Sequence, residues 1–218
     1  MSFTPAAPLL ISRLITLLIS FTVHEFSHAL AATLLGDESP RREGRLTLNP
    51  FKHLDPWGVI LLLIMGYGWA RPVRVNSYAV QRKNRAGMMW VSLAGPLSNF
   101  LLASLGAFLL THGYYAASFS GIPSWLPTPQ MFLNQFIQIN LSLMVFNLLP
   151  IAPLDGEKVV RYFIPDSIKS AWDSIQHNGY RIMMALFFIL PYLGYNFAGR
   201  FISNVTASLY FFLMRFPG

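Results

Sequence analysis

The residues best suited to chemistry are two histidines and a glutamate in one apolar stretch, FTVHEFSHALAATLLG (residues 21–36). On a helix, His24 and His28 point to the same side and lie close enough together for both imidazoles to bind one metal ion. Glu25 lies beside the first histidine, where its carboxylate can reach a water molecule on that metal. Two ligands and a general base on one helical turn are typical of zinc hydrolases, where zinc lowers the pKa of water to about 7.

A catalytic zinc site usually has three protein ligands, so a third must come from elsewhere in the chain. The chain has no cysteine, which leaves histidine and carboxylate side chains. The other histidines are His53, His112 and His177. Asp155 is the strongest candidate, because it lies between prolines and a glycine in LPIAPLDG (149–156), where an unwound helix end can turn towards a neighbouring helix. The alternative is that Asp155 only caps the segment that follows it.

The composition indicates a membrane protein. Hydrophobic residues make up 54% of the 218 residues and charged residues only 11%, whereas a soluble domain has about 25% charged residues. The net charge of +7 would also suit a nucleic-acid-binding protein. The basic residues, however, lie between the apolar stretches, which is the pattern of cytoplasmic loops. We therefore expect the lipid bilayer, and no nucleic acid, as a partner.

Five apolar stretches are long enough, or nearly so, to cross a bilayer, which takes about 20 residues. The first has no positive segment before it and is too long for a signal peptide, so we expect a retained helix. A sixth stretch, Trp57 to Ala70, is shorter and rich in glycine, and it either dips into the membrane and returns or crosses as a short tilted helix. The last two of the five predict a helical hairpin with its turn near Gly199 and Arg200. The five stretches are 8–35, 87–111, 131–151, 181–198 and 199–215.

The positions of lysine and arginine predict the orientation. If 57–70 re-enters, the basic loops on both sides of it stay in the cytoplasm, and 112–130, which has no lysine or arginine, lies outside. Arg13 and Arg200 are then the outer exceptions. We therefore expect a multi-pass protein of the cell membrane with its N-terminus outside and its C-terminus in the cytoplasm. The first helix and 131–151 then run in the same direction, which brings the histidine pair and Asp155 towards the cytoplasmic side.

Several segments together resemble the site-2 protease family of intramembrane zinc metalloproteases. The resemblance covers about residues 20–160 and implies that His24, His28 and Asp155 hold one zinc ion per chain and that Glu25 is the general base. Asn147 matches a family position that helps to hold the substrate backbone, although an asparagine there can also serve helix packing. The matching segments are HEFSH (24–28), GRLTLNPFKHLDPWG (44–58), AGPLSN (94–99) and NLLPIAPLDG (147–156).

In this family 44–58 corresponds to a membrane-re-entrant β-hairpin. The residues from Arg45 to Leu48 alternate polar and apolar as a strand does, and Asn49-Pro50 marks a turn. An open strand edge there would accept an extended substrate by strand addition. His53 is expected to hold this loop near the site. The predicted fold is thus an all-α polytopic membrane protein of five to six transmembrane helices with a short re-entrant β-hairpin or loop.

The resulting hypothesis is a zinc metalloendopeptidase that cuts a single-pass membrane protein in or near its transmembrane segment, close to the cytoplasmic face. One integral-membrane protease domain, 1–218, is expected, with a catalytic core over about 8–160 and a C-terminal hairpin over about 180–216. It would be a minimal form without a PDZ or CBS domain. The alternatives are a divalent-metal transporter, which has no need of Glu25, and a non-catalytic membrane-protein binder.

Overall fold

The computed structural model describes residues 7–55, 57–58, 70–113 and 122–215, most of which are helical. Most of the stretch 57–70 therefore lies outside the described residues. The elements are α1 (Ala7–Leu34), α2 (Ser39–Arg42), the 3₁₀ turn η1 (Pro50–Lys52), α4 (Ser77–Lys83), α5 (Gly87–Thr111), α6 (Pro129–Asn147), α7 (Asp155–Phe163), α8 (Asp166–Gln176), α9 (Gly179–Met184), the π-helical η2 (Ala185–Ile189), α10 (Leu190–Tyr192) and α11 (Phe197–Met214).

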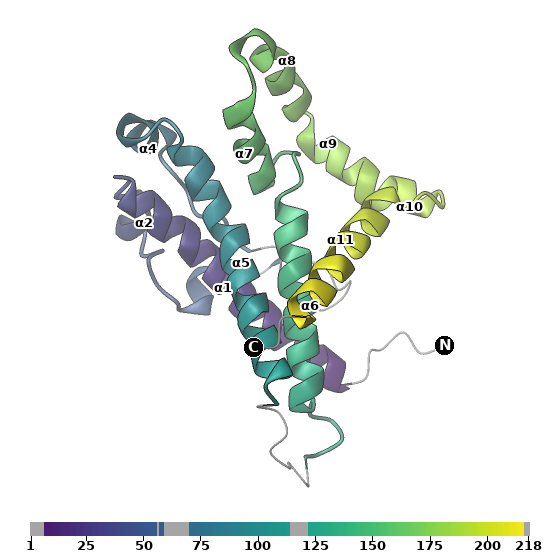
Figure 1. Ribbon diagram of the computed structural model, residues 1–218. Coiled ribbons are helices and arrows are strands. Elements are labelled where there is room, and N and C mark those ends of the chain that lie inside the picture. Colours follow the sequence, from purple (N-terminus) through teal and green to yellow (C-terminus); the bar gives the residue numbers. More distant parts are fainter. Residues whose placement is uncertain (1–6, 56, 59–69, 114–121, 216–218) are drawn as a thin grey trace.

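Helices α1, α5 and α6 form the centre of the molecule. Helix α5 packs against both α1 and α6, and α1 also contacts α6 (Figure 1). A Cβ atom at Gly106 of α5 would lie only 3.0 Å from Cγ1 of Ile137 on α6, so a small residue is needed for this close approach. The α5–α6 contact buries one apolar cluster, made of Ala103, Ala107, Leu110, Ile137 and Leu141.

Two of the predicted membrane spans are confirmed as long apolar helices, since α1 and α5 match 8–35 and 87–111. Among the described residues, these two helices are long and apolar enough to cross a membrane, and the bent pair Gly179–Tyr192 and Phe197–Met214 would make a third if it is one span. Helix α6 ends at Asn147, several residues before the predicted end of its span. The five to six predicted crossings therefore remain a prediction.

The predicted position of the C-terminal turn was wrong. The chain bends by 96° between Tyr192 and Phe197, whereas Gly199 and Arg200 lie within α11. Gly194 has a φ of +90°, a conformation that favours glycine. The Asn196 side chain then caps α11 by accepting a hydrogen bond from the backbone N–H of Gly199 at 3.1 Å. Gly199 was predicted to lie near the turn, but it lies in the first turn of α11.

The segment 44–58 does not form the predicted β-hairpin within its described residues. Its one contact of β type is an isolated antiparallel bridge between Leu54 and Ala70. The predicted turn at Asn49-Pro50 is confirmed, because the Asn49 side chain accepts from the N–H of Phe51 at 3.1 Å and starts η1.

His53 and Arg45 hold this loop together from inside. His53 is fully buried, and its Nε2 donates to the carbonyl of Thr47 at 2.8 Å. The His53 carbonyl accepts from the N–H of Arg71 at 2.7 Å. The Arg45 guanidinium is also buried and donates to the carbonyls of Lys52 and Arg71. These contacts support the predicted structural role of His53.

Candidate metal centre

Three side chains that can bind metal meet in one place, as the sequence predicted. The Nε2 atoms of His24 and His28 lie 3.0 Å apart. Oδ2 of Asp155 lies 3.2 Å from the first and 3.1 Å from the second. The three residues are 6%, 8% and 9% exposed, so the cluster is shielded from solvent. Among the described residues, these three are the histidine and carboxylate side chains that lie close enough together to hold one metal ion.

Helix α1 supplies the two histidines, and the start of α7 supplies the carboxylate. Leu154 occupies the N-cap position of α7 and Asp155 its first turn, where the helix dipole favours a negative charge. Gly156 allows this helix start to pack closely on the turn after α6, because a Cβ atom there would lie 2.2 Å from the carbonyl oxygen of Leu148. The Asp155 carboxylate contacts the histidines, which argues against a role that is only capping.

The Nδ1 atom of each imidazole forms a hydrogen bond with an oxygen acceptor. Nδ1 of His28 lies 2.7 Å from the carbonyl oxygen of Val91. A carbonyl can only accept, so this Nδ1 carries the hydrogen, and in the neutral imidazole Nε2 presents its lone pair. Nδ1 of His24 lies 2.6 Å from Oδ1 of Asn99, with the same consequence. When both imidazoles are neutral, each turns the lone pair of its Nε2 towards Oδ2 of Asp155, as ligands around a shared cation do.

This donor set fits a zinc ion. Three electron-pair donors about 3 Å apart repel one another unless a cation lies between them. Ligand atoms on one tetrahedral zinc, at about 2.1 Å from it, stand about 3.4 Å apart, close to the distances of 3.0–3.2 Å found here. Helix α5 leaves room beside them, because a Cβ atom at Gly95 would lie 2.5 Å from Nε2 of both histidines.

Glu25 is also buried and has a fixed partner that the sequence did not reveal. Its Oε2 accepts a hydrogen bond of 2.9 Å from the backbone N–H of Val73. Val73 belongs to the irregular segment 70–76, which leads into α4. A second carboxylate binds the same segment three residues later, since Oδ2 of Asp37 accepts from the N–H of Asn76 at 2.7 Å. The segment 70–76 is thus tied to α1 and to the residues just after it.

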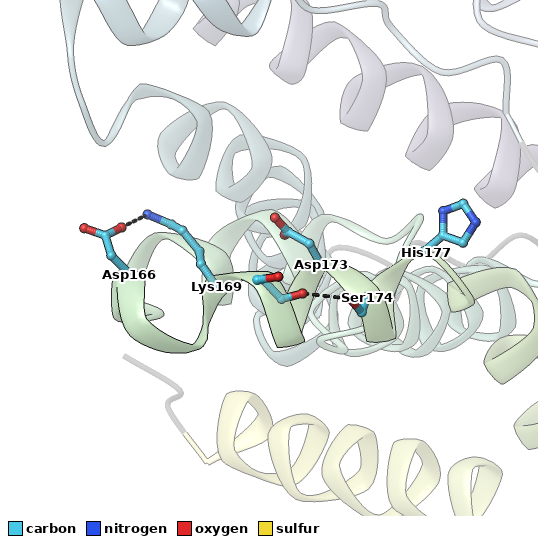
Figure 2. Close-up of a pocket in the computed structure, with 6 residues that line it drawn as sticks. Asp166, Lys169, Asp173, Ser174 and His177 are labelled. Atoms are coloured by element: carbon cyan, nitrogen blue, oxygen red, sulfur yellow. Dashed lines mark hydrogen bonds and ion pairs between the residues drawn. The ribbon is translucent and has the colours of Figure 1, made fainter.

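The remaining predicted candidates lie outside the cluster. Asn147 ends α6, and its amide nitrogen donates to the carbonyl of Leu143 at 2.9 Å. His112 follows the end of α5. His177 follows α8 and lines a shallow, exposed groove along that helix, where Lys169 and Asp166 form an ion pair (Figure 2). Neither histidine was expected to be the third ligand.

Sequence reasoning missed the residues that support the ligands. The segment AGPLSN (94–99) stood out by resemblance, but no role was predicted for Gly95 or Asn99. Asn140 of α6 was missed as well. Each of these residues meets its partner across a helix interface, far away in the sequence, so local spacing carries no signal for the contact.

Comparisons with known proteins agree with the geometry. Residues 12–124 and 115–190 match the family model of peptidase family M50. "Putative zinc metalloprotease YwhC" of Bacillus subtilis is 42% identical over 175 residues, which cover 79% of this chain and 78% of the relative. "Putative zinc metalloprotease Rip2" of Mycolicibacterium smegmatis is 30% identical over 201 residues, which cover 84% of this chain and 72% of the relative. No solved structure matches the chain. The chain therefore belongs to peptidase family M50, the site-2 protease family that its motifs resemble.

Proposed function

We propose that this chain is an intramembrane zinc metalloendopeptidase. Its substrate would be a single-pass membrane protein, cut within or near the transmembrane segment and close to the cytoplasmic face. The observation that carries the proposal is the buried triangle of His24, His28 and Asp155, with Glu25 next to the first histidine and held by a backbone N–H. Membership of peptidase family M50 supports a metalloprotease.

The residues would divide the work of peptide hydrolysis among them. His24, His28 and Asp155 would hold zinc, which when bound supplies a Lewis acid for the scissile carbonyl and for water. Glu25 accepts a proton from the attacking water and passes it to the nitrogen of the leaving chain. One water is consumed, the peptide C–N bond breaks, and a new carboxyl group and a new amino group form. The Val73 N–H holds Glu25 in place before substrate arrives.

The location of the site explains the choice of a membrane substrate. Two of the three ligands lie on α1, an apolar helix of 28 residues that is long enough to span a bilayer. A transmembrane substrate helix satisfies its own backbone hydrogen bonds, so it must unwind before it can be cut. The segment 70–76 lies beside Glu25 and would offer backbone groups to an unwound strand. The oxygen of Asn147 is a second group of this kind.

The proposal is tested with the purified protein in lipid vesicles together with a model single-pass substrate. Wild type should release fragments cut in or near the substrate's membrane segment, as read by mass spectrometry. Glu25→Gln keeps the size of the side chain but removes the base, so cleavage should slow by about 10²- to 10⁴-fold. Zinc content should stay unchanged, because Glu25 is not a proposed ligand.

The matched control is Glu38→Gln, which changes an exposed glutamate just beyond α1. Cleavage by this variant should equal that of wild type. A chelator should abolish the wild-type reaction and added zinc should restore it. If Glu25→Gln cleaves as fast as wild type, the proposed base is wrong. Vesicles that take up divalent metal equally with wild type and Glu25→Gln, without any cleavage, would favour a transporter instead.

A further inference from the structure

A row of buried amides connects the metal centre with helix α6. Oδ1 of Asn99 on α5 lies 2.6 Å from Nδ1 of His24. The amide nitrogen of Asn99 donates to Oδ1 of Asn140 on α6 at 3.0 Å. The amide nitrogen of Asn140 donates in turn to the backbone carbonyl of Phe136 at 2.8 Å. Both asparagines are 0% exposed. The row thus joins α1, α5 and α6 through one set of hydrogen bonds.

The last group in this row fixes the direction of every bond. The carbonyl of Phe136 can only accept, so the NH₂ group of Asn140 must face it, and the oxygen of Asn140 faces Asn99. The oxygen of Asn140 can also only accept, so the NH₂ group of Asn99 faces it. The oxygen of Asn99 is then left for His24. The Nδ1 atom of His24 must therefore carry the hydrogen, and in the neutral imidazole its Nε2 atom is left with a lone pair.

We propose that Asn99, oriented by Asn140, is a positioning residue that holds His24 in the tautomer and ring orientation in which Nε2 can bind a metal ion. The outer partners of metal-binding histidines fix the tautomer in this way and strengthen the ligand. The inference rests on the proposed zinc site. It assigns to AGPLSN (94–99) a physical role, since Gly95 leaves room for the ion and Asn99 orients one of its ligands.

Burial sets these two amides apart from ordinary polar contacts between helices. A buried amide without hydrogen-bond partners is costly, so both asparagines depend on the complete row. Asn134 offers a comparison on the same helix. It makes the same kind of bond to the backbone of α6, from its amide nitrogen to the carbonyl of Gln130 at 2.9 Å. Its oxygen, however, accepts from the hydroxyl of Tyr210 on α11 at 2.6 Å, away from the histidines.

The experiment measures zinc affinity of the full-length protein in detergent by competition with a chromophoric chelator. The variants are Asn99→Leu, Asn140→Leu and the double variant, with Asn134→Leu as the matched control. Leucine keeps the size of asparagine and removes its hydrogen bonds. Asn99→Leu should weaken zinc binding about 10- to 100-fold. Asn140→Leu should weaken it less, because the oxygen of Asn99 remains. Asn134→Leu should bind zinc as wild type does.

The double variant distinguishes positioning from packing. Asn140 acts on His24 only through Asn99, so the double variant should bind zinc no more weakly than Asn99→Leu alone. Cobalt in place of zinc gives a second reading, because the visible spectrum of Co²⁺ should change in Asn99→Leu and stay unchanged in Asn134→Leu. If Asn99→Leu does not fold, Asn140→Leu tests the same row without touching the histidine.

Unchanged zinc affinity in Asn99→Leu, or in Asn140→Leu where only that variant folds, would overturn the inference. The inference would also be overturned if the fold-losses of zinc affinity in the two single variants multiply in the double variant. Asn140 would then act independently of Asn99. If wild type itself binds no zinc, the proposed function fails instead, and the two failures are told apart by that one measurement.

Discussion

Gly95 marks the point at which a single residue decides whether the metal centre can exist. It lies on α5, and a Cβ atom there would come within 2.5 Å of Nε2 of both His24 and His28. Atoms this close cannot coexist, so a side chain at this position must displace the imidazoles or occupy the place of the ion.

We predict that Gly95→Ala weakens zinc binding by at least about tenfold, since it disturbs two ligands at once. Gly106→Ala is the control on the same helix, because its Cβ atom would press on Ile137 at 3.0 Å and not on the histidines. That variant should lose about 1–3 kcal/mol of stability through overpacking and keep its zinc affinity. Equal zinc affinity in Gly95→Ala and wild type, measured by chelator competition, would contradict the described approach of α5 to the ligands.

Val73 acts through its backbone, so only a backbone change can test its contact with Glu25. Val73→Pro removes the N–H that donates to Oε2 of Glu25. We expect the variant to cleave a membrane substrate at least several-fold more slowly while its zinc content stays that of wild type. Arg74→Pro, at the next and exposed position, leaves this N–H in place and serves as the control. Slower cleavage in both variants to the same degree would show that the segment, and not this hydrogen bond, matters.

Asp37 joins the end of α1 to helix α2 and to the segment 70–76. Gly36, at a φ of +94°, ends the helix. The carboxylate of Asp37, only 1% exposed, accepts from the backbone N–H of Ser39 at 2.9 Å and from that of Asn76 at 2.7 Å. The first bond supports the start of α2, and the second holds the segment 70–76 that also carries the partner of Glu25.

We predict that Asp37→Asn lowers the free energy of unfolding by about 1.5–3 kcal/mol, the range for a hydrogen bond to a charged group. The amide would turn an NH₂ group towards one of the two N–H donors. Glu43→Gln removes an exposed carboxylate of the same loop and should change stability by less than about 0.5 kcal/mol. Thermal unfolding in detergent near pH 7 provides the comparison. Equal unfolding midpoints for Asp37→Asn and wild type would refute the stabilising role of the two Asp37 hydrogen bonds.

The same residue predicts a pH dependence. Burial by itself raises the pKa of Asp37, but the hydrogen bonds from Ser39 and Asn76 bring it below its ordinary value of 3.8. A carboxyl group with a lower pKa in the folded state stabilises the fold above the pKa of the unfolded chain and loses this effect as pH falls through the folded value. The stability difference between wild type and Asp37→Asn should therefore hold at neutral pH and shrink below about pH 3.8. A difference that grows in acid would reverse the assigned sign.

Sequence patterns predicted the elements that depend on local signals and missed those that depend on distant partners. The long apolar runs predicted α1 and α5 closely, and the spacing of His24 and His28 predicted their convergence. The alternation in 45–48 suggested a strand, but the buried Arg45 and the cap at Asn49 organise an irregular loop instead.

The supporting contacts of the site have no local signal at all. The bond between His24 and Asn99 spans 75 positions, and that between Glu25 and Val73 spans 48. The bond between Asn99 and Asn140 spans 41 positions. Each partner is of a common residue type and has no diagnostic spacing, so only the packing of α1, α5 and α6 reveals it.

For the whole molecule, the direction of the helices links the site to one side of a membrane. Helices α1 and α6 run in the same general direction and α5 runs against them, so that the end of α1 and the start of α7 lie towards the same side (Figure 1). The basic residues of 41–52 follow the end of α1 in the sequence, and those of 71–85 precede the start of α5. By the positive-inside rule, we propose that this side faces the cytoplasm.

The absence of native cysteine makes this orientation easy to test. We predict that a membrane-impermeant maleimide labels Ser124→Cys in intact cells but labels Ser170→Cys only after the membrane is opened. Both positions are exposed. Ser124 lies before α6, and Ser170 lies within α8. The opposite labelling pattern would place the metal centre towards the outside and contradict the predicted topology.

The proposed function depends on the binding of one zinc ion by His24, His28 and Asp155. Its most direct test is the zinc content of the purified protein, wild type against Asp155→Ala, with Asp166→Ala as the control because that carboxylate is exposed on α8. We expect about one zinc per chain in wild type and Asp166→Ala, and a zinc affinity at least about tenfold weaker in Asp155→Ala. Wild-type zinc binding in Asp155→Ala, or no zinc in wild type, would contradict it.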